Sequence, residues 1–163
     1  MGPVSAMLQH SSHLPEVEFA SGEVVVREGG AAGGIFILVS GVLQVRKNGV
    51  LVNSISRPGA LVGEMSLLLR GPHSATVEAT THCVMRYAAD GDALLSSDPE
   101  IAKHVAVGLA ERLNFVTTYL ADLKHQYGDA PGLAMVSDVL SRLAQRTGPR
   151  ATPGSRREPD PEY

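Results

Sequence analysis

The sequence predicts a mainly β domain with flanking helices. Short apolar runs separated by glycine turns occupy about residues 15–87, and a heptad pattern occupies residues 99–127. The chain has 163 residues, of which 44% are hydrophobic and 19% charged. That composition suits one folded domain with an aliphatic core and is too apolar for a disordered chain.

Residues 15–87 carry the β signal. Apolar runs of strand length lie at 24–27, 35–39, 42–45 and 50–52. Asn48-Gly49, between the last two, is the strongest hairpin signal, because this pair tolerates the positive φ angles of a type I′ turn. Many short strands at this spacing indicate an antiparallel barrel or sandwich.

The two ends of the chain lack such patterns. Residues 1–15 mix Ser, His, Gly and Pro without periodicity, so we expect a flexible arm. Residues 148–163 hold four prolines, three arginines and three acids in sixteen residues, so we expect a disordered tail.

Two helices are expected between residues 99 and 147. Asp98-Pro99-Glu100 is a helix start, with an N-cap residue, proline at the first helical position and an acid near the positive end of the dipole. The helix over 99–127 then carries a heptad seam of Ala106, Leu109, Leu113, Val116, Leu120, Leu123 and Tyr127. A shorter helix with one apolar face follows within 128–147, from Pro131 to about Arg146.

The segment with the most chemical information is residues 63–77, which we name the cassette. Gly63-Glu64, a short apolar run, Gly71-Pro72 and a β pattern predict a strand, one helical turn, a tight turn and a strand. The free N–H groups at the start of such a turn suit an anion. Glu64 would accept from a hydroxyl beside that anion; alternatively, it only caps the short helix.

Residues 19–127 resemble the cyclic nucleotide-binding domain of catabolite activator proteins, kinase regulatory subunits and gated channels. The resemblance rests on ordered glycines, on the Gly63-Glu64 pair and on the sequence Ser74-Ala75-Thr76-Val77. It implies a β-jelly roll with flanking helices over residues 16–127, ending in the long helix 99–127.

The resemblance also implies a set of ligand-binding residues. In the family, backbone amides of the cassette hold the cyclic phosphate, the acid matching Glu64 accepts from the ribose 2′-hydroxyl, and a hydroxyl of the long helix meets the base. The expected ligand-binding residues are Gly63, Glu64, Met65, Ser66, His73, Ser74, Ala75 and Thr117. Thr118 is an alternative to Thr117, and either is equally a polar residue beside the heptad seam. Ser74 does not decide between adenine and guanine.

His73 departs from the family pattern, which usually has arginine there to pair with the phosphate. Histidine has a reference pKa of about 6.5 and lacks the bidentate fork of arginine. Losing a charged pair costs about 1.5–3 kcal/mol, or ten- to a hundredfold in affinity. Either His73 still serves once protonated, or the pocket is degenerate; Arg70 is a further substitute.

Composition limits the other functions. A net charge of −3 and a pI near 6.0 argue against DNA binding by this chain alone, and the residues after Tyr127 are too few for a winged helix–turn–helix. No membrane span or signal peptide is expected, and Cys83, the single cysteine, is expected to be a small buried residue. We expect no catalytic residues, no metal site and no cofactor.

The function predicted from the sequence is that of a cytoplasmic regulatory module that binds a cyclic nucleotide, cAMP more than cGMP. It would signal through its C-terminal helices, as a homodimer joined through residues 103–127, with residues 131–146 available to a protein partner. The alternative is a ligand-free scaffold of the same fold, which His73 favours and Glu64 disfavours. The sequence leaves open whether the chain stands alone or is a fragment of a larger protein.

Overall fold

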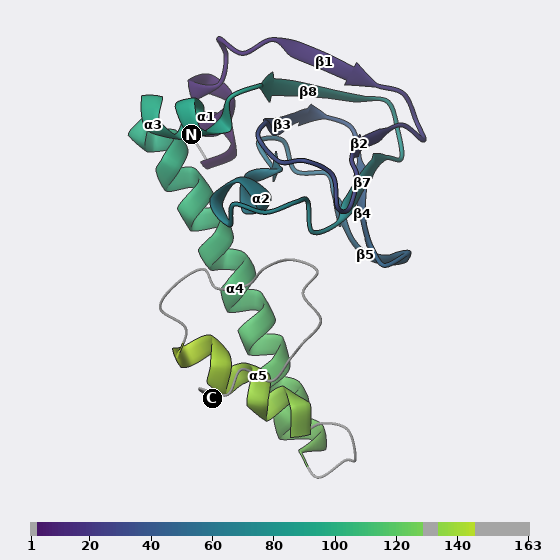
Figure 1. The fold of residues 1–163 in the computed structure, drawn as a ribbon, viewed down its shortest axis with the longest axis vertical. Coiled ribbons are helices and arrows are strands. Elements are labelled where there is room, and N and C mark those ends of the chain that lie inside the picture. The colour runs from purple at the N-terminus through teal and green to yellow at the C-terminus, as the bar shows by residue number, and fades with distance from the viewer. Residues whose placement is uncertain (1–2, 129–133, 146–163) are drawn as a thin grey trace. The chain divides into compact units, whose positions relative to one another are not determined.

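A computed structural model describes residues 3–128 and 134–145. It contains eight strands and five helices (Figure 1) in the described residues. These residues fall into two units that meet at Val105 and Ala106 within one long helix, and each unit is described by itself. None of the described helices has both the length and the apolarity needed to cross a membrane.

The strands form a β-jelly roll of two four-stranded antiparallel sheets, as expected. One sheet has the order β1-β8-β3-β6 and the other β2-β7-β4-β5. The strands are β1 (Glu16–Phe19), β2 (Val24–Val26), β3 (Ile35–Ser40), β4 (Leu43–Lys47), β5 (Val50–Ile55), β6 (Leu61–Val62), β7 (Thr76–Ala79) and β8 (Cys83–Ala88). Their buried side chains form the main core cluster of Leu38, Leu43, Val62, Val77, Ala79, Cys83 and Met85.

The predicted hairpin is confirmed in detail. Lys47 of β4 pairs with Val50 of β5, which leaves Asn48 and Gly49 as the two turn residues. Their φ angles are 50° and 76°, the left-handed conformation that a type I′ turn requires at both positions. Cys83 is also buried as expected, and its thiol donates to the carbonyl of Val42.

The N-terminal prediction is wrong for part of its range. The structure has a helix, α1 (Pro3–His10), where a flexible arm was expected over 1–15. Met7 and Ser11 are buried, and Arg86 of β8 donates hydrogen bonds to the carbonyl of Leu8 and the hydroxyl of Ser11. A helix of two turns shows little periodicity, so its docking on β8 was not visible in the sequence.

Helices α3 (Gly91–Ser97) and α4 (Pro99–Tyr127) follow β8. The long helix begins and ends where the sequence predicts. Asp98 caps it, because its Oδ1 accepts a hydrogen bond of 2.9 Å from the N–H of Glu100. The side chains of Ile101 and Val105, in the first two turns, are buried. The shorter α3 was not predicted, although Asp90 is an N-cap whose carboxylate accepts from the N–H of Ala93.

The second unit holds the remainder of α4 and the helix α5 (Ala134–Gln145). The expected start at Pro131 and the expected tail 148–163 lie outside the described residues. The heptad seam is unevenly covered, because Leu109, Leu120 and Leu123 are half-buried, whereas Leu113, Val116 and Tyr127 are exposed.

Candidate functional site

The cassette has the predicted order of a strand, one short helix, a turn and a strand. The helix α2 (Glu64–Leu68) lies between β6 and β7. Its N-cap is Gly63, with a φ angle of 98°, and no side chain caps its first turn. A Cβ at Gly63 would lie 2.7 Å from the carbonyl oxygen of Gly34, so both the backbone angle and the space require glycine here.

Glu64 and Ser66 point into the protein from the first turn of α2. Their exposed fractions are 3% and 4%, whereas that of Met65 between them is 40%. Burial of a carboxylate is costly unless polar partners surround it, so the position of Glu64 is unusual for an acid that acts only as a helix cap.

His73 faces Ser66 across the cassette. The ring nitrogen Nδ1 lies 2.9 Å from Oγ of Ser66, and the same Oγ lies 3.1 Å from the carbonyl oxygen of Gly63. The backbone of His73 is held as well, because its N–H donates to the carbonyl of Gly30 and its carbonyl accepts from the N–H of Gly29. The structure thus brings Gly63, Ser66 and His73 together.

Burial lowers the pKa of His73 below its usual value of 6.5, and a hydrogen bond with the backbone of Ala31 partly offsets this effect. Desolvation disfavours the charged imidazolium. An anion near the ring would act in the opposite direction.

The remaining predicted site residues lie in two places. Ser74 and Ala75 are half-buried and lead from His73 into β7, and the carbonyl of Ser74 accepts from Nζ of Lys47 at 2.8 Å. Thr117 lies on the part of α4 that belongs to the second unit, so its role stays a prediction.

Arg70, the possible substitute for the missing arginine, is engaged elsewhere. Its Nη1 lies 2.7 Å from Oδ2 of Asp92 on α3, and both side chains are more than half exposed. The pair joins the end of α2 to α3. This contact disfavours Arg70 as the phosphate partner.

The glycine pair 29–30 was not predicted as part of the site. A Cβ at Gly30 would lie 2.9 Å from the carbonyl oxygen of Arg27 and 3.7 Å from Cδ2 of His73. Two adjacent glycines after a strand signal a close backbone approach, and this signal could have located the loop that holds His73.

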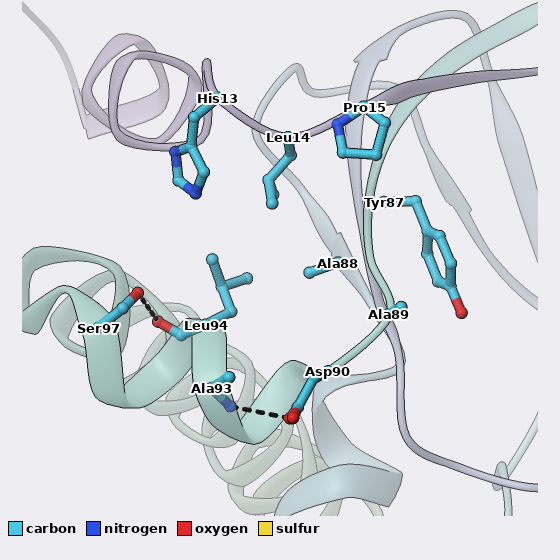
Figure 2. Close-up of a pocket in the computed structure, with 10 residues that line it drawn as sticks. All are labelled: His13, Leu14, Pro15, Tyr87, Ala88, Ala89, Asp90, Ala93, Leu94 and Ser97. Atoms are coloured by element: carbon cyan, nitrogen blue, oxygen red, sulfur yellow. Dashed lines mark hydrogen bonds between the residues drawn. The ribbon is translucent and has the colours of Figure 1, made fainter.

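A separate pocket of about 410 Å³ lies between the segment His13–Pro15 and α3. Figure 2 shows Leu14 and Leu94 among its lining residues, with Tyr87 to one side. Two of its polar groups are used internally, because Asp90 accepts from the N–H of Ala93 and Ser97 donates to the carbonyl of Leu94. The pocket is therefore mostly apolar and unlike a phosphate site.

Comparison with known proteins agrees with this geometry. Residues 16–96 match the cyclic nucleotide-binding domain family. The chain is 31% identical over 154 residues to the CRP-like cAMP-activated global transcriptional regulator of Mycobacterium tuberculosis, an alignment that covers 88% of this chain and 65% of that protein. It is 40% identical over 72 residues to a cAMP-dependent protein kinase regulatory subunit of Yarrowia lipolytica, covering 44% of this chain and 19% of that one.

Solved structures share the fold. The catabolite activator protein of Thermus thermophilus has a TM-score of 0.59 at 23% identity, with 91% of each chain covered. A second structure, Sp-2Cl-cAMPS bound to PKAR CBD2, has a TM-score of 0.52 at 21% identity, with 70% of this chain and 86% of that chain covered. Together, the matched residues, the jelly roll and the cassette show that residues 16–96 belong to the cyclic nucleotide-binding domain family.

Proposed function

We propose that this chain is a regulatory module that binds a cyclic nucleotide, cAMP in preference to cGMP. The cassette carries this proposal, because it holds Glu64 buried on the first turn of α2 and the His73 ring against Ser66. The preference for cAMP follows from the relatives, which are described as a cAMP-activated regulator and a cAMP-dependent kinase subunit.

Each group has a distinct role in this proposal. The first-turn amides of α2 and His73 would bind the cyclic phosphate, Glu64 would accept from the ribose 2′-hydroxyl, and Ser74 and Ala75 would line the site. Thr117 would contact the base. Binding would signal through α4 and α5 only if the nucleotide has unequal affinity for two arrangements of these helices.

Calorimetric titration with cAMP and cGMP at pH 6 and pH 8 tests the proposal. We expect binding that is tighter for cAMP and weaker at pH 8. Glu64→Gln keeps the shape but removes the charge, and should weaken binding about tenfold or more. Glu100→Gln, at an exposed position outside residues 103–127, is the matched control. Equal affinities of the Glu64 variant and the wild type would refute the ribose assignment.

A ligand-free scaffold of the same fold is the second candidate. The specific observation in its favour is that the polar atoms of His73 already contact Ser66 and Ala31. No heat and no thermal stabilisation with either nucleotide at millimolar concentration would select the scaffold. The function would then reside in protein contacts, with residues 131–146 as the surface to test.

We also propose that the module is a cytoplasmic homodimer without catalytic activity. The exposed Leu113, Val116 and Tyr127 support pairing through residues 103–127, because an apolar seam favours association. Sedimentation should give twice the chain mass of 17.2 kDa. A monomer at all concentrations would refute the homodimer.

A further inference from the structure

The His73 ring sits between two glycine-containing turns. A Cβ at Gly63 would lie 3.6 Å from its Cε1, and a Cβ at Gly30 would lie 3.7 Å from its Cδ2. Both distances are ordinary van der Waals contacts, so the two glycines pack against opposite sides of the imidazole without clashing with it. Hydrogen bonds to Gly29 and Gly30 hold the backbone of His73 in place. The orientation of the ring then depends mainly on the polar contacts of the ring itself.

The hydrogen bond between Ser66 and His73 can change its direction with the protonation state of the ring. Its hydroxyl has one proton, yet Oγ lies near two groups, the carbonyl of Gly63 at 3.1 Å and Nδ1 of His73 at 2.9 Å. When Nδ1 carries a proton, the ring donates to Oγ and the hydroxyl donates to Gly63. When Nδ1 is unprotonated, the hydroxyl turns to donate to the ring, and its bond to Gly63 is lost.

A hydrogen bond with the backbone of Ala31 also acts on the ring. It raises the pKa of His73, so it favours the charged form. The doubly protonated ring therefore satisfies Ser66, Ala31 and, through Ser66, Gly63 at the same time. Burial is the opposing effect, and it is the larger of the two.

The charged side chains near His73 contact other groups, are exposed to solvent, or are buried on α2. Lys47 donates to the carbonyl of Ser74, and Arg70 pairs with Asp92. Glu28 accepts from the N–H of Asn48, and Arg27 on the same loop is exposed. Glu64 is buried on α2 next to Gly63.

We infer that Ser66 is a positioning residue that holds His73 ready to receive a proton, so that binding of an anionic cyclic nucleotide takes up about one proton. This inference rests on the proposed function. The phosphate supplies the negative charge that offsets the desolvation of the imidazolium. The proton comes from solvent and enters the ring, and no covalent bond to the ligand forms.

Calorimetry with cAMP at pH 7.5, in two buffers of different ionisation enthalpy, measures the proton uptake. We expect a clear uptake for the wild type and none for His73→Arg, which is charged throughout and should bind about tenfold or more tightly. Ser66→Ala should bind about three- to tenfold more weakly, with altered uptake. Ser56→Ala, at an exposed serine, should match the wild type.

Nitrogen NMR of His73 in the free chain adds a readout that needs no ligand. Ser66→Ala should change the tautomer populations and the titration midpoint of His73, and Ser56→Ala should not. Unchanged His73 resonances in Ser66→Ala would overturn the positioning role. Zero uptake in a wild type that binds cAMP would overturn the proton coupling alone. If neither the wild type nor His73→Arg binds, the proposed function and the proton coupling both fail.

Discussion

His73 and His10, both in the first unit, each contact a side-chain oxygen through Nδ1. The oxygen belongs to a neutral hydroxyl in one case and to a carboxylate in the other. In the cassette, Nδ1 of His73 contacts the neutral hydroxyl of Ser66, and burial lowers the pKa of His73. Between α1 and α4, Nδ1 of His10 lies 2.6 Å from the carboxylate oxygen Oδ2 of Asp98. His10 therefore has a carboxylate of the protein itself as its partner.

The difference indicates which of the two histidines could interact with the negative charge of a ligand. The contact of His10 with Asp98 joins α1 to the junction of α3 and α4 within the fold (Figure 1). Around His73 the structure shows a hydroxyl and backbone groups as partners, so an anion from outside would supply the charge that offsets a proton on the ring. The following changes test this comparison, from the largest expected effect to the smallest.

Gly63→Ala should have the largest effect, because it combines a positive φ angle with a 2.7 Å approach to the carbonyl oxygen of Gly34. We expect the free energy of unfolding to fall by about 2–4 kcal/mol in urea denaturation. Gly22→Ala is the control, since its φ angle is 90° but nothing lies within 4 Å of the added Cβ. It should cost about 1–2 kcal/mol. Equal losses would mean that the contact with Gly34 does not constrain the cassette.

Arg86→Met should loosen α1 and leave the cassette in place. The change removes the donors to the carbonyl of Leu8 and the hydroxyl of Ser11, at a cost of about 1–3 kcal/mol. Hydrogen exchange should accelerate for residues 6–11 and stay constant for residues 63–73. Unchanged exchange in α1 would show that the ion pair of His10 with Asp98 and the burial of Met7 hold the helix without Arg86.

His73→Gln should flatten the dependence of stability on pH just below neutrality. Because burial lowers the pKa of His73 in the folded chain, the unfolded chain binds this proton first as the pH falls below 6.5. The wild type should therefore lose stability from pH 7 downward, until the lowered folded pKa is passed. Thermal unfolding of both proteins from pH 8 to pH 5 measures the difference. Parallel curves would contradict the desolvation of the ring.

Asp98→Asn should have the smallest effect, confined to more acidic pH. Hydrogen bonds from the N–H of Glu100 and from His10 lower the pKa of Asp98 below its usual 3.8. Its contribution to stability is thus complete above pH 3.8 and is lost as the pH falls through the lower folded pKa. Asparagine still caps a helix, so the change isolates the charge. Parallel stability curves of the two proteins below pH 3.8 would contradict this assignment.

The elements that were predictable depend on local chemistry. Asn48-Gly49 forms its turn because both residues tolerate positive φ angles, and Asp98-Pro99 starts α4 because a carboxylate cap and a fixed φ angle act within one turn. The cassette was recognisable for the same reason. By contrast, α1 has two turns, and Met7 is the one buried apolar side chain among residues 6–10, so its local signal is weak.

The sequence by itself determined a mainly β domain of the barrel or sandwich type, the long helix and the short helical turn that opens with Gly63 and Glu64, because backbone preferences and apolar periodicity act between near neighbours. The resemblance to the cyclic nucleotide-binding domain family implied the jelly roll, and it implied that His73 stands where that family usually has arginine. Only the tertiary structure decided what that histidine touches. Its contacts with Ser66, and with Gly30 and Ala31 from a loop more than forty residues away, depend on which segments the two sheets bring together, and no local preference encodes that.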